Sequence, residues 1–148
     1  MTDPTRVVVR PASETDALDV LAWRNDPVTR AMARNQDEVD TAAHLAWFGK
    51  ALADPQRTFL IGEVDGEKIG MVRFDRGEET EVSINLNPAH RSRGLSYPLL
   101  MAGLAYVGGD VWAEIRPENT ASVRLFERAG FEFREIRGGL RRYLRRST

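Results

Sequence analysis

With 148 residues, of which 42% are hydrophobic and 29% charged, the chain has the length of one domain (residues 1–148) and the composition of a globular protein. The net charge of −1 gives no overall attraction to nucleic acid, and the absence of cysteine excludes disulfides, thiolate metal sites and cysteine nucleophiles. His44 and His90 are the only histidines and lie far apart, so we expect no metal. Without an apolar signal segment or a membrane-length apolar run, we expect a cytoplasmic protein that does not bind membranes.

The first third of the chain is predicted to hold one strand followed by helices. Residues 6–10 are rich in Val and precede Pro11, which favours a strand. Ser13 and Asp16 have the spacing of a capping box, so a helix is expected to follow them. Its inward face is expected to contain Leu18, Leu21 and Ala22.

Two more helices are predicted before the main group of strands. One begins at Asp26-Pro27, and the other begins at Asp40 or Thr41 and ends at Asp54-Pro55. We expect His44 to form a structural hydrogen bond rather than to act as a base. The aromatic residues of this helix that are expected in the core are Trp47 and Phe48.

The rest of the chain is rich in predicted strands. Periodicity and turn residues predict them at residues 58–64, 68–74, 80–86, 111–115, 131–136 and 140–144. Asp65-Gly66 and Gly138-Gly139 mark hairpins, and helices are expected over residues 99–106 and 119–129. Hairpins combined with one β-α-β unit indicate an α+β fold: a mixed, mostly antiparallel sheet of about six to seven strands with helices on both faces.

The most informative segment is residues 87–96, which joins the strand 80–86 to an apolar helix. A strand, a tight basic turn and a helix can hold a phosphate, because unpaired N–H groups and the helix dipole attract anions. Gly94 would let the backbone approach the ligand, and Arg91 and Arg93 would supply charge at the rim. The alternative is an ordinary turn with solvated arginines, and spacing alone does not decide between the two.

Two motifs in the expected order resemble those of the GNAT superfamily, the acetyl-coenzyme A-dependent N-acetyltransferases. The first is Arg91-Ser92-Arg93-Gly94-Leu95-Ser96, which matches the family's Arg/Gln-x-x-Gly-x-Gly/Ala loop except for Ser96. The second runs from Asn119 to Phe131 and matches Asn-x-x-Ala/Ser-x-x-Leu-Tyr-x-x-x-Gly-Phe, with Phe126 in place of Tyr. The resemblance implies the GNAT fold and acetyl-coenzyme A as cosubstrate.

The same resemblance implies which residues contact the cosubstrate. Leu86 would bond the pantetheine arm through its backbone, as an added strand does. Asn119 would bond the same arm, or cap its helix, or do both. Phe126 also belongs to this set, although it cannot donate a proton as the family's usual Tyr does. The pyrophosphate would be held by backbone amides of Ser92, Arg93, Gly94, Leu95 and Ser96, with Arg91 at the entrance.

Attack of an amine on a thioester needs a base, an N–H donor for the oxyanion and often an acid for the thiolate. On the strand 80–86, Glu81, Ser83 and Asn85 alternate with apolar residues, which suggests the wall of a cleft. Glu81 is the candidate base, acting through water, and its alternative is a solvated carboxylate. Ser122 is the candidate group for protonating the thiolate, or an ordinary helix residue.

The acceptor is expected to be a primary amine on a small polar molecule or a peptide. Residues 23–27, 44–48, 72–75 and 83–86 resemble a bacterial subgroup that acetylates the 4-amino group of UDP-linked amino sugars, which makes a nucleotide-linked amino sugar the first hypothesis. Similar segments occur in ribosomal-protein N-terminal acetyltransferases. Residues expected to contact the acceptor are Arg24, Ser83, Asn85 and Glu114.

Two questions stay open at this point. A non-catalytic acyl-coenzyme A-binding or sensor domain is the alternative to an enzyme, because Phe126 replaces the usual acid. The oligomeric state is not determined, with a homodimer as one option. The terminal arginines are expected to form a solvated face that could also meet a diphosphate; they are Arg134, Arg137, Arg141, Arg142, Arg145 and Arg146.

Overall fold

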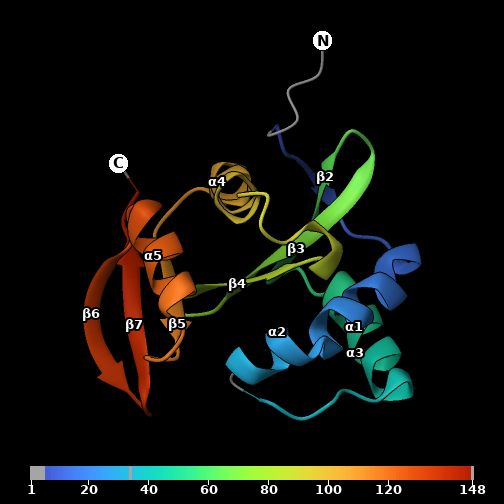
Figure 1. Cartoon of the computed structure of the whole chain (residues 1–148), viewed down its shortest axis with the longest axis horizontal. Helices are drawn as coiled ribbons and strands as arrows, with labels where there is room; N and C mark the ends of the chain where they lie inside the picture. The colour runs from blue at the N-terminus through green and yellow to red at the C-terminus, as the bar shows by residue number, and fades with distance from the viewer. Residues whose placement is uncertain (1–5, 34, 148) are drawn as a thin grey trace.

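A computed structural model describes residues 6–33 and 35–147, which form one seven-stranded sheet with helices on both faces (Figure 1). The strands are β1 (Val8–Pro11), β2 (Arg57–Val64), β3 (Glu67–Arg76), β4 (Thr80–Leu86), β5 (Val111–Ile115), β6 (Glu132–Arg137) and β7 (Leu140–Arg145). Their order is β1-β2-β3-β4-β5-β7-β6, and every pairing is antiparallel except β4 with β5. The predicted mixed, mostly antiparallel sheet is confirmed.

Helices separate into two groups by the face of the sheet that they cover. The α-helices are α1 (Ala17–Asn25), α2 (Pro27–Met32), α3 (Thr41–Ala53), α4 (Ser96–Val107) and α5 (Thr120–Arg128), and the short 3-10 helices are η1 (Glu14–Asp16) and η2 (Pro88–His90). Leu60 of β2 packs in the core under α4 and α5, whereas Phe59 and Ile61 pack with α1 and α3. This alternation places the two helix groups on opposite faces.

The core beneath α4 depends on one close approach. A Cβ at Gly103 would lie 2.8 Å from a methyl group of Val72 on β3, so glycine lets the helix settle onto the strand. On the other face, Trp23 and Phe48 are buried against Phe59 and Met71. Trp47 is partly buried at the edge of this second core, so it is less enclosed than Phe48.

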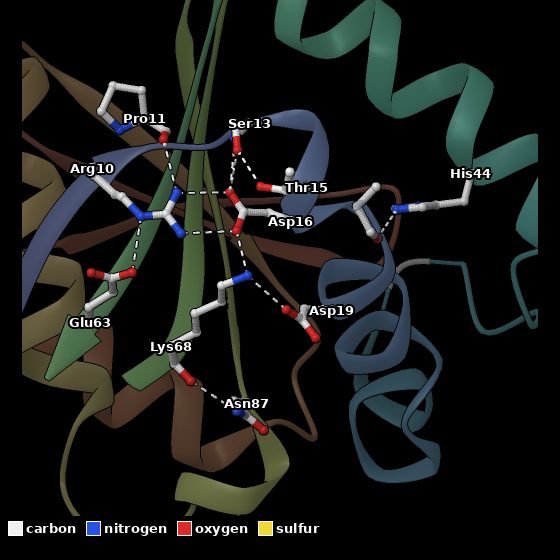
Figure 2. A network of polar contacts seen from close by, with 11 residues as sticks. Arg10, Pro11, Ser13, Thr15, Asp16, Asp19, His44, Glu63, Lys68 and Asn87 are labelled. Carbon is white, nitrogen blue, oxygen red and sulfur yellow. Dashed lines mark hydrogen bonds and ion pairs between the residues drawn. The ribbon is translucent and has the colours of Figure 1, made fainter. Parts of the chain in front are cut away.

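A buried carboxylate joins the start of α1 to the strands (Figure 2). Asp16 is fully buried and accepts hydrogen bonds from Arg10 of β1, at 2.8 and 2.9 Å, and from the backbone N–H of Ser13 at 2.9 Å. Lys68 of β3 forms a 2.7 Å ion pair with the same carboxylate. These donors, Arg10 above all, hold the pKa of Asp16 well below its usual range despite its burial. The Ser13–Asp16 pairing agrees with the predicted capping box.

Two sequence predictions about exposure are wrong. In α1 the buried residues are Ala17, Val20, Leu21 and Trp23, whereas Leu18 is 63% exposed. The anchoring of Asp16 and the bulk of Trp23 set the rotation of the helix, which the short apolar pattern did not reveal. In the terminal hairpin Arg142 is only 3% exposed, because β7 lies between β5 and β6 and does not form an edge.

Arg142 tolerates burial because acidic and aromatic groups surround it. Its guanidinium donates to the carboxylates of Glu79 and Glu135. The guanidinium carbon also lies 4.2 Å from the ring centroid of Trp112 on β5, a cation–π contact. One terminal arginine is therefore a structural residue that ties β7 to the turn before β4.

Candidate active site

The site lies where β4 and β5 separate. In the described part of the chain, Glu81 opposite Trp112 is the only pair in the parallel β4–β5 ladder. A cavity of about 480 Å³ lies toward the C-terminal ends of these two strands. It is lined by residues 81–86 of β4 and by residues 114–116, where β5 ends. Helices α1, α2 and α5, strand β3 and the loop that leads into α4 contribute to the other walls. An open groove of this kind between two neighbouring strands exposes backbone groups that a ligand can pair with.

The inner wall carries the predicted polar row of β4. Val82 is buried under α4, and Ile84 and Leu86 pack against the same core. Glu81, Ser83 and Asn85 lie in register with Asp75, Arg73 and Met71 of β3, on the opposite face. The predicted alternation therefore matches the packing. Glu81 and Glu114, one from each separating strand, both line the cavity.

The loop before α4 has the backbone geometry expected of an anion-binding turn. Ser92 and Gly94 adopt positive φ angles of 65° and 68°. A Cβ at Gly94 would meet no heavy atom within 4 Å, so space is open beside it. Helix α4 then begins at Ser96 without a side-chain cap, which leaves its first N–H groups available to a ligand.

Side chains in this loop do not all point to the cavity. Arg91 and Ser96 line it, whereas Leu95 is buried in the main core. Any phosphate contacts from Ser92, Arg93, Gly94 and Leu95 would therefore use backbone groups, as the family resemblance implies. Arg93 contributes its guanidinium to a hydrogen bond with the Nδ1 atom of His90.

Arg91 has a partner that the sequence did not reveal. Its guanidinium forms an ion pair with Asp26 and a 3.1 Å hydrogen bond to the hydroxyl of Thr29. Asp26 also caps α2 by accepting the backbone N–H groups of Val28 and Thr29. The hydrogen bond from Arg91 is the main cause that holds the pKa of Asp26 below its usual range. Arg91 therefore ties the loop to α2 and brings less uncompensated charge to the rim than expected.

Helix α5 closes the other side of the cavity. Asn119 caps the helix, because its side-chain oxygen accepts the backbone N–H of Ser122 at 3.2 Å. Ser122 and Phe126, one turn apart, both line the cavity. Phe126 is buried edge-on against Phe131 at a centroid distance of 4.9 Å. The structure thus places the predicted residue in the site and provides no hydroxyl at that position.

The cavity wall contains more positive than negative side chains. Arg24, which was expected near the acceptor, lines the cavity from α1. Arg73 and Arg116 also line it and were not predicted from the sequence. For Arg73 a signal existed, since a charged residue interrupts the apolar strand 68–74 on the face that it shares with Ser83. For Arg116, which donates to the Ala33 carbonyl, no local pattern indicated the site.

Two further observations bear on the chemistry. Within residues 6–33 and 35–147, no group of three or more His, Asp and Glu side chains could hold a metal ion. No helix in the same ranges is long and apolar enough to cross a membrane. The charged and hydroxyl side chains that line the cavity include the carboxylates of Glu81 and Glu114, the hydroxyls of Ser83 and Ser122, and several arginines.

Comparison with known proteins identifies the family of this chain. An acetyltransferase (GNAT) domain matches residues 6–132. The chain is 28% identical over 126 residues to mycothiol acetyltransferase of Clavibacter sepedonicus, covering 81% of this chain and 39% of that protein. It is 33% identical over 104 residues to N-alpha-acetyltransferase RimI of Mycobacterium tuberculosis, covering 66% of this chain and 63% of that protein.

A solved structure supports the fold independently. The enzyme AAC(6')-Ib, in complex with ribostamycin and coenzyme A, superposes with a TM-score of 0.83 at 18% identity, covering 95% of this chain and 93% of that one. At that identity the likeness concerns the fold alone. The family match covers most of the chain. It includes both motifs, which are residues 91–96 and residues 119–131. The chain belongs to the GNAT family of acetyltransferase domains.

Proposed function

We propose that this protein is an N-acetyltransferase that transfers an acetyl group from acetyl-coenzyme A to a primary amine of a small polar acceptor. One observation carries the proposal: the cavity between β4 and β5 holds a carboxylate on each strand and adjoins the uncapped start of α4. The cavity therefore brings together an anion-binding turn, an open strand edge and acid–base groups. The coenzyme A bound to the structural neighbour AAC(6')-Ib supports the choice of cosubstrate.

The residues present fit acetyl-coenzyme A. The open space beside Gly94 and the free amides at the start of α4 suit a pyrophosphate. Leu86 lies at the end of β4 where the strand has separated from β5, so its backbone can pair with the pantetheine arm. The side-chain oxygen of Asn119 accepts the capping hydrogen bond, and its amide N–H₂ group is available to donate to a ligand. Acetyl-coenzyme A would supply the activated acetyl thioester.

The side chains of this protein would then manage the protons. Glu81 takes a proton from the attacking amine, directly or through a water molecule, and Glu114 across the groove is the second candidate. Ser122 stands one helical turn from Phe126 and can donate to a departing thiolate. Since Phe126 has no hydroxyl, water is the other proton source for that step. Holding amine and thioester together supplies much of the remaining acceleration.

A nucleotide-linked amino sugar is the acceptor that we put first. Its support is the resemblance of residues 23–27 and 44–48 to that subgroup, together with the arginines that line the cavity. A peptide α-amino group is the second candidate, and the similarity to N-alpha-acetyltransferase RimI favours it. A non-catalytic acyl-coenzyme A-binding domain is the third, because of Phe126.

The test is turnover with a panel of amines, followed as release of free thiol from acetyl-coenzyme A. The panel contains a UDP-linked 4-amino sugar, short peptides with free N-termini and spermidine. We expect thiol release with at least one amine, and the highest kcat/KM for the amino sugar. Binding of acetyl-coenzyme A without thiol release from any amine would refute the enzymatic proposal. Efficient use of peptides alone would replace the acceptor and keep the enzyme.

A further inference from the structure

A second cavity of about 300 Å³ adjoins the first one and is lined mainly by apolar side chains. Its apolar walls include Val20, Val39, Trp47 and Phe59. Arg24, Met71, Arg73 and Asn85 line both cavities, so the two meet at the face of β3 and β4 beneath α1 and α3. A ligand that enters the larger cavity can therefore extend an apolar part into the smaller one.

Arg24 stands at this junction with an uncompensated charge. Its Nη2 atom donates to the backbone carbonyl of Asn35, whereas its Nη1 atom is buried without a hydrogen-bond partner. No carboxylate pairs with it in the described part of the chain. Burial, with repulsion from Arg30 as a lesser cause, lowers the pKa of the Arg24 guanidinium. Burial of the Nη1 group without a hydrogen-bond partner is unfavourable, and an anionic group of a ligand would remove that cost.

Arg73 provides a second cation at the same junction. Its guanidinium carbon lies 5.1 Å from the ring centroid of Trp47, and its Nε atom donates to Asp75 at 3.1 Å. Arg73 is paired in register with Ser83 of β4. Glu81 lies two residues before Ser83 on the same face of β4, about 7 Å from it along the strand. The two arginines and the candidate base thus line the same cavity.

Among the described residues, the lining of the smaller cavity carries arginines and no carboxylate. His44, which lines it, donates from Nε2 to the backbone carbonyl of Ala17, and burial lowers the pKa of its imidazole, which keeps it neutral at pH 7. A polycationic amine that extends into this cavity would therefore place positive charge beside Arg24 and Arg73 without a carboxylate from the described lining residues to balance it.

We infer that the acceptor is an amine that also carries an anionic group, a carboxylate or a phosphate, next to an apolar or aromatic part. Arg24 and Arg73 bind the anion, and the smaller cavity receives the apolar part. The inference rests on the proposed function, since it describes the acceptor of the same site. It divides amines by charge: acidic amines fit, whereas polyamines do not.

Binding measurements with matched ligands test the anion site without turnover. Calorimetry would compare L-phenylalanine with phenethylamine, which lacks only the carboxylate, and uridine monophosphate with uridine, which lacks only the phosphate. In at least one pair we expect the anionic member to bind about tenfold more tightly, which corresponds to about 1.4 kcal/mol. The pair that shows the difference identifies the anion. Equal affinities within both pairs would overturn the inference.

Variants assign the effect to Arg24. In Arg24→Met the preference for the anion should shrink to below about threefold, which corresponds to less than about 0.7 kcal/mol. Arg30→Met is the control, because Arg30 lies close by on α2 but lines neither cavity. The preference should persist in this control. An equal loss in both variants would show a general effect of charge and would contradict the site. Since no carboxylate among the described residues pairs with Arg24, Arg24→Met should unfold at the same temperature as the wild type or at a higher one.

The apolar cavity is tested with a filling substitution. Ala43 lines the smaller cavity, so a Phe side chain at this position should occupy it. In the ligand pair that shows the anion preference, Ala43→Phe should weaken binding of both ligands by about tenfold. Ala42→Phe is the control, because Ala42 and Ala43 are both exposed on α3 and only Ala43 lines the cavity. Equal effects of the two substitutions would count against the cavity as the apolar subsite.

Turnover separates this inference from the proposed function. If spermidine releases thiol with a higher kcat/KM than the acidic amines do, the enzyme stands and the inference about its acceptor is wrong. If the anionic ligands bind as expected and no amine releases thiol, the proposed function is the part that fails.

Discussion

Replacing Gly94 by Asp tests whether the loop before α4 binds the pyrophosphate. Gly94 has a φ of 68°, and no heavy atom lies within 4 Å of the position where a Cβ would be. Gly138 in the β6–β7 hairpin offers a matched control, with a φ of 59° and equally open surroundings. Both substitutions therefore impose the same backbone conformation on Asp and add the same charge. Only the first one does so beside the candidate binding site.

The expected magnitudes differ for folding and for binding. An L-residue in this left-handed conformation costs about 1–2 kcal/mol, so both variants should remain folded and lose a similar amount of stability. A carboxylate about 6 Å from one phosphate charge is repelled by about 2.8 kcal/mol at an effective dielectric constant of about 20. That energy corresponds to about a 100-fold weaker affinity. Steric overlap with the phosphate would add to it.

Calorimetry with acetyl-coenzyme A measures the affinity, and thermal unfolding confirms that each variant is folded. We expect Gly94→Asp to bind about 100-fold more weakly and Gly138→Asp to bind within about twofold of the wild type. Gly94→Ala should fall between them, because it keeps the strain and omits the charge. Unchanged affinity in folded Gly94→Asp would refute the assignment of this loop to the pyrophosphate.

Two further predictions concern the base and the buried carboxylate. Glu81→Gln should lower kcat by about 100-fold at neutral pH with little change in affinity for acetyl-coenzyme A. Equal rates for the variant and the wild type from about pH 6 to 9 would show that Glu81 is not the base. Glu114 would then be the candidate base, and Glu114→Gln would test it. Asp16→Asn should lower the free energy of unfolding by about 3 kcal/mol in urea titrations at pH 7, because Asp16 is fully buried between Arg10 and Lys68. Asp19→Asn is the control at the exposed end of the network, and it should lower the free energy of unfolding by less than about 1 kcal/mol. The pKa of Asp16 is lowered in the folded state, so its contribution is complete above the ordinary carboxyl value of 3.8 and is lost as the pH falls below it. The difference between Asp16→Asn and the wild type should therefore narrow below that pH, and a constant difference would contradict the assignment.

The sequence predicted the parts of the site that lie within one continuous stretch. Alternation along β4 placed Glu81, Ser83 and Asn85 on one face, and the structure has them so. Asn119 was predicted as a helix cap or a ligand, and the cap is present. In both cases neighbouring residues determine the geometry, because strand alternation and helix capping are local properties.

Contacts between distant segments were beyond the reach of local patterns. Arg91 and Asp26 are 65 residues apart, and only the folded chain brings the loop against the cap of α2. Arg142 was expected on a solvated face together with the other terminal arginines. The strand order places β7 between β5 and β6, so Glu79 and Glu135 meet its side chain from two sides. Burial of a charge depends on such partners, which the sequence pattern does not show.

The proposed cosubstrate and acceptor sites differ in how well the sequence predicted them, again because local patterns do not show contacts between distant segments. The proposed cosubstrate site would use backbone groups around Gly94 and at the start of α4, and a short motif is enough to specify backbone geometry. The proposed acceptor site is made of side chains from α1, α3, β2, β3 and β4, which approach one another only in the folded protein. Arg24 lies there without a carboxylate partner in the described chain, a property that depends on every neighbouring element. The nature of the acceptor therefore has to be inferred from assembled charges, and Arg24 is the residue whose substitution tests it most directly.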